Sequence, residues 1–115
     1  MAKITLDNEK YDLVLDYDAI EYLEDHFDKD ILTIMNEIDV KQSTQRHFIY
    51  AMNMNQQGLE LSEVKDKFKA LFNSGEYDYQ EVMKPILEAF KESKPFKKMA
   101  ENNKKKSPKK PSESA

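Results

Sequence analysis

The chain changes character after Ser93, and this break limits which residues can build a core. Residues 94–115 contain eight lysines, two glutamates and few apolar side chains. A segment of this composition cannot bury enough apolar surface to offset the entropy lost on ordering it. We therefore expect a folded body over residues 1–93 and a flexible, Lys/Pro/Ser-rich tail over residues 94–115. Within the tail, we expect a frayed transition at 94–100 and disorder over 101–115.

The two parts also carry opposite charge. Residues 1–93 contain 10 Lys and Arg against 20 Asp and Glu, whereas residues 94–115 have a net charge of +6, so the whole chain has a net charge of -4. Lysine clusters can bind the phosphates of nucleic acid. A solubilising terminus is the reading we favour, because a lysine tail without arginine is a weak sign of such binding. In addition, phosphate would repel the acidic body.

Side chains that carry out catalysis are scarce. The chain has no cysteine, which excludes disulfides, thiolate zinc sites and thiol nucleophiles. Its two glycines, Gly58 and Gly75, are too far apart to form a glycine-rich phosphate loop. The two histidines, His26 and His47, lack the spacing of a metal-binding pair on a helix. We therefore predict a non-enzymatic protein with no catalytic residues, no cofactor and no metal site.

The composition is that of a soluble protein. Charged residues make up 35% of the chain, against about 25% in an average globular domain. No window approaches the ~18 consecutive apolar residues that a membrane span needs. Met1 is followed within a few residues by acidic side chains, without the apolar stretch of a signal peptide. We expect no membrane partner.

The first fifteen residues predict a β-hairpin. Apolar and polar residues alternate over Lys3–Leu6, and Leu13 and Leu15 lie on one face of a second strand. The polar stretch Asp7–Lys10 between them is typical of a turn. Because a two-stranded hairpin is marginally stable alone, it should pack against other elements.

The rest of the body is predicted to form four or five short helices, which makes the fold α+β and mostly α. Asp18 and Glu21 have the spacing of a capping box at the start of the first helix. Ser62 and Asp78 are the predicted N-caps of two later helices. Pro85 lies inside the last of these helices, where we expect a kink or a restart.

The predicted core combines the apolar face of the hairpin with the apolar stripes of the helices. Its members are Leu13, Leu15, Ile20, Leu23, Phe27, Ile31, Phe48, Val64, Phe68, Leu71, Ile86 and Leu87.

A partner-binding surface is predicted from an excess of tyrosine and methionine. Phe48, Tyr50, Met52 and Met54 cannot all face one core on a helix of 3.6 residues per turn, so some should face outward. Adaptable side chains of this kind suit a surface that accepts an apolar partner. The predicted partner-binding residues are Tyr50, Met54, Tyr77 and Tyr79.

The order of these patterns resembles a known family. It comprises the hairpin pattern of Lys3–Leu13, the helix opening of Asp16–Glu24, the apolar pair Ile31-Leu32 and the helix start Leu61–Val64. Over residues 3–90 the chain resembles the small tail assembly chaperones of long-tailed phages and prophages of Gram-positive bacteria. The matching positions are apolar or capping residues, and none is a catalytic motif.

The resemblance implies a chaperone that coats the long helical tape measure protein before the tail tube polymerises around it. The tape measure protein is then the main expected partner, and the major tail tube protein is a second candidate. Self-association into head-to-tail arrays would suit a long target with many equivalent apolar stripes. The implied location is the cytoplasm of the bacterial host. The alternative function is a small nucleic-acid-binding or regulatory phage protein that uses residues 94–115.

Overall fold

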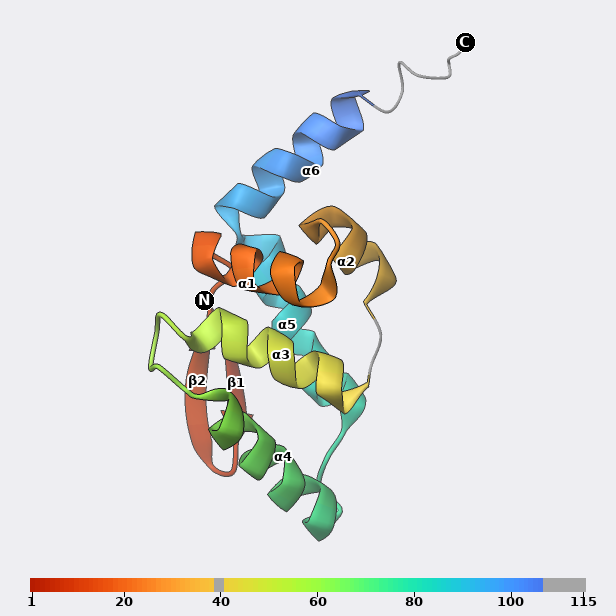
Figure 1. Cartoon of the computed structure of the whole chain (residues 1–115). Coiled ribbons are helices and arrows are strands. Elements are labelled where there is room, and N and C mark those ends of the chain that lie inside the picture. Colours follow the sequence, from red (N-terminus) through yellow and green to blue (C-terminus); the bar gives the residue numbers. More distant parts are fainter. Residues whose placement is uncertain (39–40, 107–115) are drawn as a thin grey trace.

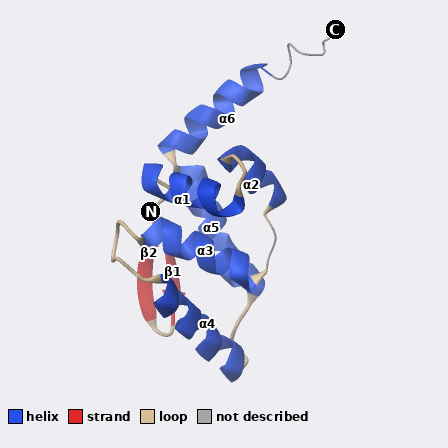
Figure 2. Ribbon diagram, in the orientation of Figure 1, coloured by secondary structure: helices blue, strands red, loops and turns tan. Residues whose placement is uncertain are grey.

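A computed structural model describes residues 1–38 and 41–106, the last four of them by their backbone alone. Within these residues an antiparallel hairpin is followed by six helices (Figures 1 and 2). The elements are β1 (Ala2–Leu6), β2 (Glu9–Leu13), α1 (Tyr17–Phe27), α2 (Ile31–Glu37), α3 (Gln42–Asn53), α4 (Leu61–Ser74), α5 (Tyr79–Glu92) and α6 (Lys94–Lys106). The predicted α+β, mostly α fold is confirmed.

The hairpin forms where its sequence pattern predicts it. Asp7 and Asn8 both have positive φ angles, 51° and 67°, as a two-residue type I′ turn requires. The strands pair from Leu6 opposite Glu9 to Ala2 opposite Leu13. One face of β1 is buried against the helices, and the other carries exposed polar side chains. The hairpin therefore acts as a cover over one side of the helical body.

Two helix starts differ from the predicted capping residues. The side chain of Asp16 accepts a hydrogen bond from the Ala19 amide at 3.0 Å, so Asp16 caps α1 and the predicted Asp18 box is wrong. Glu60 precedes α4, and its amide donates to the Glu63 carboxylate at 2.8 Å. In both cases the cap lies two residues earlier than predicted, because the chain leaves its extended conformation sooner.

The start of α5 agrees with the prediction, but its interior does not restart. Asp78 accepts hydrogen bonds from the amides of Gln80 and Glu81, at 2.9 and 3.2 Å. The helix then runs unbroken through Pro85. Proline removes one backbone hydrogen bond there. Burial of the apolar face of α5 on both sides of Pro85 holds the helix together despite that loss.

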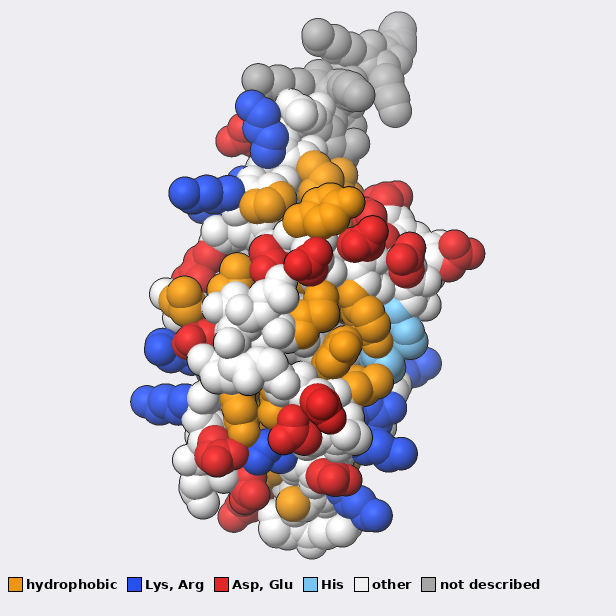
Figure 3. All heavy atoms as spheres, turned by 60° about the vertical axis from the view of Figure 1, so that its left-hand side comes forward, with side chains coloured by type: hydrophobic (Ala, Val, Ile, Leu, Met, Phe, Trp, Pro, Cys, Tyr) orange, Lys and Arg blue, Asp and Glu red, His pale blue; other side chains and the backbone are white. Residues whose placement is uncertain are grey.

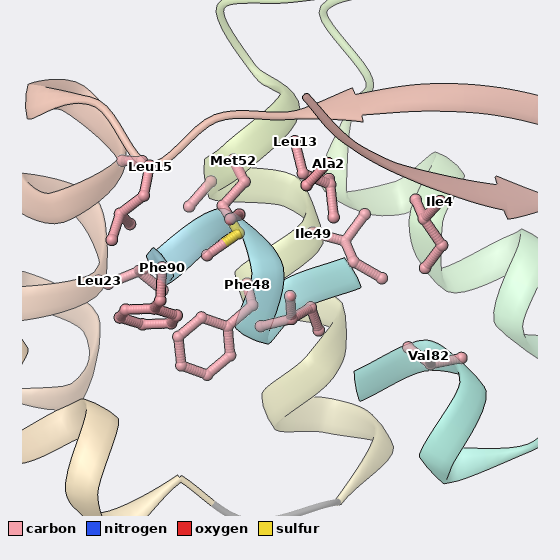
Figure 4. Packing of buried hydrophobic residues seen from close by; sticks show 14 of the residues in the cluster. Ala2, Ile4, Leu13, Leu15, Leu23, Phe48, Ile49, Met52, Val82 and Phe90 are labelled. Atoms are coloured by element: carbon pink, nitrogen blue, oxygen red, sulfur yellow. The ribbon is translucent and has the colours of Figure 1, made fainter. Parts of the chain in front are cut away.

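The core lies between the hairpin, α1, α3 and α5 (Figure 4). The rings of Phe48 and Phe90 meet there with centroids 5.8 Å apart. The predicted core residues that are buried are Leu13, Leu15, Ile20, Leu23, Ile31, Phe48, Val64, Phe68 and Ile86. The other three, Phe27, Leu71 and Leu87, are only partly buried and pack against the outside of the core.

Residues 94–106, the first part of the predicted tail, form helix α6. The hydroxyl of Ser93 accepts a hydrogen bond from the Phe96 amide at 3.2 Å and donates one to the Leu15 carbonyl at 2.7 Å. Phe96 also packs edge-on against Phe90, with ring centroids 5.1 Å apart. This cap and the packing of its first turns allow a lysine-rich segment to form a helix, which projects from the body (Figure 1). The rest of the predicted tail, 107–115, lies outside the described residues.

Candidate partner-binding surface

The structure brings two of the four predicted partner-binding residues together. Tyr77 and Tyr79 lie 5.0 Å apart, measured between ring centroids, where α4 leads into α5. Tyr50 lies in the carboxyl-terminal half of α3 and Met54 directly follows that helix; both side chains are partly buried. Within the described part of the chain, no ring contact or hydrogen bond joins either of them to the two tyrosines of the α4–α5 connection. The predicted surface therefore divides into two separate places.

Phe72, Tyr77 and Tyr79 form what we call the α4–α5 aromatic cluster. Phe72 stacks on Tyr77 with ring centroids 4.2 Å apart, and Tyr79 lies edge-on to Phe72 at 6.0 Å. Phe72 is 41% exposed and Tyr79 is 40% exposed. Tyr77 in turn contacts the buried ring of Phe68 at 5.1 Å. An exposed apolar surface thus rests directly on the core.

Gln45 holds the aromatic cluster in place. Its side chain is fully buried. Its Oε1 accepts a hydrogen bond from the Tyr77 hydroxyl, and its Nε2 donates to the Tyr79 carbonyl at 3.0 Å. Burial raises the pKa of Tyr77 well above its ordinary value, so this hydroxyl remains a donor throughout the physiological range.

The turn before the cluster also has a defined conformation. Gly75 ends α4 with a φ of 79°, a left-handed conformation that glycine adopts without steric cost. The amides of Glu76 and Tyr77 both donate to the carbonyl of Leu71, at 2.9 and 3.2 Å. The cluster is therefore a preorganised surface rather than a loose loop.

The sequence pattern does not identify Phe72 as a surface residue. The apolar pattern of α4 places Phe72 next to Leu71 and Phe68, and this pattern predicts that all three residues belong to one buried stripe. Of these three residues only Phe68 is fully buried, because α4 extends past the body at its carboxyl end. Two adjacent apolar residues at a helix end could have indicated that one of them faces outward.

Tyr50 belongs to a second group of rings between α1 and α3. It lies edge-on to Tyr22 with ring centroids 5.0 Å apart. The Tyr22 hydroxyl hydrogen bonds with Nδ1 of His47 at 2.9 Å. His26 and His47 stack with centroids 3.8 Å apart. Figure 3 shows hydrophobic side chains beside the histidines on this side of the molecule.

The two histidines do not form a metal site by themselves. Their rings are nearly parallel, with an interplanar angle of 25°, so their nitrogen atoms do not converge on one point. Among residues 1–38 and 41–106, no three His, Cys, Asp or Glu side chains are grouped as a metal ion would need. The stacked rings of His26 and His47 are part of the packing between α1 and α3.

Stability should fall as the pH drops from 7 to 5, because of His47. Burial and the charge of His26 lower the pKa of His47 from 6.5 to about 4. The unfolded chain therefore takes up a proton near pH 6.5 that the folded chain resists. Allowing for partial exposure, we expect the free energy of unfolding to decrease by about 1 kcal/mol over this range.

Urea unfolding at pH 7, 6 and 5 measures this effect. The variant His47→Gln keeps a polar partner for Tyr22 but cannot titrate at position 47. Between pH 7 and pH 5, its free energy of unfolding should therefore fall by about 1 kcal/mol less than that of the natural chain. Most carboxylates titrate below this window, which isolates the histidine contribution. Equal pH dependence in the two proteins would contradict the assignment to His47.

Over the part of the chain that the structure describes, none of the helices has the length and apolar character to cross a membrane. Comparisons with protein-family models, with curated proteins and with solved structures found no match to this chain. A function for the chain therefore has to be inferred from its own residues and from their arrangement.

Proposed function

We propose that this chain is a non-enzymatic tail assembly chaperone of a long-tailed phage or prophage. Its role is to bind apolar helical segments of the tape measure protein in the cytoplasm of the bacterial host, and to keep them in solution until the tail tube forms. The proposal rests on the resemblance over residues 3–90 and on the exposed α4–α5 aromatic cluster.

The aromatic cluster is the observation that carries the proposal. Phe72 and Tyr79 expose large rings on a scaffold fixed by Gln45 and Tyr77. Rigid aromatic side chains lose little conformational entropy on binding and act as anchors for apolar partners. Truncating such an anchor typically costs about 2 kcal/mol or more of binding free energy.

The charge of the body supports the same role. Residues 1–93 have twice as many acidic as basic side chains. Many copies bound along one target would each present this negative surface, which favours solubility of the coated complex. The long target would require several copies, and contacts between neighbouring chaperones are part of the proposal.

Co-expression with the tape measure protein of the same phage genome tests the role. We expect the tape measure protein to become soluble only when this chain is present. The double variant Phe72→Ala/Tyr79→Ala should bind about 1,000-fold more weakly, because two anchors of about 2 kcal/mol each amount to about 4 kcal/mol. Soluble tape measure protein is measured after centrifugation, and binding is measured by calorimetry on a purified segment.

Tyr17→Ala is the matched control, since Tyr17 is 72% exposed on α1 and lies outside both ring groups. It should solubilise the tape measure protein as well as the natural chain does. Tyr50→Ala and Met54→Ala test the two remaining predicted residues, at the carboxyl-terminal end of α3 and directly after it. A tape measure protein that is equally soluble without this chain would refute the role. If the Phe72→Ala/Tyr79→Ala variant solubilised the tape measure protein as well as the natural chain does, the aromatic cluster would be refuted as the binding surface.

A further inference from the structure

Strand β1 has one edge paired with β2 and the other edge open. The type I′ turn makes Leu6 and Glu9 a hydrogen-bonded pair, so the N–H and C=O groups of Lys3 and Thr5 point away from β2. Among the described residues, no hydrogen bond uses these four groups. An open edge of this kind can pair with another extended chain.

The outer edge of β2 differs from that of β1, because the body covers its carboxyl-terminal end. The Asp12 amide donates to Oε1 of Gln57 at 2.9 Å, and the Val14 amide donates to the Met52 carbonyl at 2.9 Å. These bonds attach that edge to α3 and to the loop after it. The hairpin therefore offers mainly one side, that of β1, for pairing.

A groove of about 440 Å³ runs along the open edge of β1. One wall is β1, and the other is formed by the first half of α5 and the turn before it. Figure 4 shows Ile4 of β1 and Val82 of α5 facing one another across this region. The apolar residues that line the groove are Ile4, Leu6, Leu71, Tyr77, Val82 and Pro85.

The rim of the groove carries an excess of negative charge. Its two lysines already have acidic partners, since Lys84 pairs with Glu81 at 3.4 Å and Lys3 pairs with Asp12 at 3.1 Å. Three further carboxylates line the groove, and within the described part of the chain none of them has an ion-pair partner. They are Glu76, Asp78 and Glu88.

We infer that this groove binds an extended segment of a partner protein, which adds to β1 as a third strand. Hydrogen bonds to Lys3 and Thr5 would hold its backbone. Side chains at alternate positions would face the apolar floor, and the long side chains of lysine or arginine at the positions between them would reach the carboxylates of Glu76 and Glu88 at the rim. The segment is thus alternately apolar and basic.

The charge of the rim disfavours a second copy of this chain as the occupant. Two copies joined edge to edge through β1 would bring two sets of the same carboxylates together. The inference goes beyond the proposed function, because a helical segment binds the aromatic cluster whereas an extended one binds the groove. Tyr77 is the one residue that belongs to both surfaces.

A synthetic peptide is the probe for the groove. We use a capped peptide of five Lys-Val repeats, its Glu-Val counterpart, and a Lys-Val version N-methylated along one edge. Amide exchange of the full chain is followed by NMR. The Lys-Val peptide should slow exchange of the Lys3 and Thr5 amides, and the two control peptides should not. Protection of other amides with no change at Lys3 and Thr5 would overturn the inference.

Two proline variants test the edge directly. Thr5→Pro removes an outward N–H from β1, and Lys10→Pro removes the outward N–H of the opposing residue on β2. We expect the Lys-Val peptide to bind Thr5→Pro about tenfold more weakly and Lys10→Pro as well as the natural chain. If the Lys-Val peptide bound Thr5→Pro and Lys10→Pro with equal affinity, the inference would be overturned.

A charge variant keeps the test valid should Thr5→Pro fail to fold. Glu76→Gln/Glu88→Gln should weaken peptide binding and reduce its salt dependence. Glu21→Gln/Asp25→Asn, on the exposed side of α1, is the matched control and should have no effect. Equal loss in both variants would indicate general charge attraction and overturn the groove as the site.

Two further outcomes separate the inference from its alternatives. Phe72→Ala/Tyr79→Ala should bind the Lys-Val peptide normally, so failure of the proposed chaperone role would leave this result standing. Lys109→Ser/Lys110→Ser should also bind it normally. Tighter binding by that variant would show that the chain's own carboxyl-terminal segment occupies the groove, which overturns a partner protein as its occupant.

Discussion

Phe68→Ala is expected to lower the free energy of unfolding by about 3–5 kcal/mol. Phe68 is 1% exposed, and its ring joins α4 to the core while supporting Tyr77 of the aromatic cluster. Alanine would leave a cavity in the core, and Val64 would be the one fully buried side chain of α4 that still holds this helix on the body. For a chain of this size, the melting temperature should fall by about 10–20 °C.

Phe72→Ala is the control for this prediction. It makes the same chemical change four residues later in the same helix, where the side chain is 41% exposed. We expect this variant to lose no more than about 1 kcal/mol. Thermal unfolding followed by circular dichroism compares the two variants. Equal melting temperatures would contradict the structure, because they would show that α4 does not turn Phe68 toward the core and Phe72 toward solvent.

Asn53→Ala is expected to cost about 2–4 kcal/mol, although it removes only a small polar side chain. Asn53 is fully buried at the end of α3. Its Nδ2 donates to the Asp12 carbonyl at 2.9 Å, and its Oδ1 accepts from the Leu59 amide at 2.9 Å. Alanine would leave a carbonyl and an amide without partners in the interior, and the hairpin and the loop after α3 would both loosen.

Asn55→Ala provides the comparison for Asn53→Ala. The Asn55 side chain donates to Asp16 and Asp18, but it does so at the exposed surface. We expect this variant to lose less than about 1 kcal/mol. Urea unfolding gives both values, and amide exchange at Leu59 reports the local effect. A protected Leu59 amide in Asn53→Ala would contradict the role assigned to Asn53.

Local features of the fold follow from the sequence because neighbouring residues determine them. The Asp7-Asn8 turn tolerates positive φ angles, and the alternation in β1 then fixes which side chains face inward. Asp78 caps α5 through the two amides that follow it. Residues a few positions apart make all of these contacts, so a short window of sequence contains the information.

The candidate surface depended on contacts between distant segments. Tyr77 and Tyr79 were predicted from composition, but their partner Phe72 and the buried support Gln45 were not. Gln45 lies more than thirty positions before both tyrosines, and nothing near it in the sequence indicates that a glutamine would be buried. Likewise, no helical spacing brings His26 to His47, because their stacking depends on how α1 packs against α3.

The chain beyond Ser93 shows most clearly what each level of structure determines. Its lysine-rich sequence shows that residues 94–115 cannot build a core of their own. The tertiary structure supplies what α6 needs to form, which is a Ser93 cap anchored on Leu15 and an apolar seat for Phe96 beside Phe90. Local sequence thus determined the turns, the apolar stripes and the Asp78 cap. Packing between distant elements decided which rings remain exposed and where the final helix begins, because burial depends on neighbours that only the folded chain brings together.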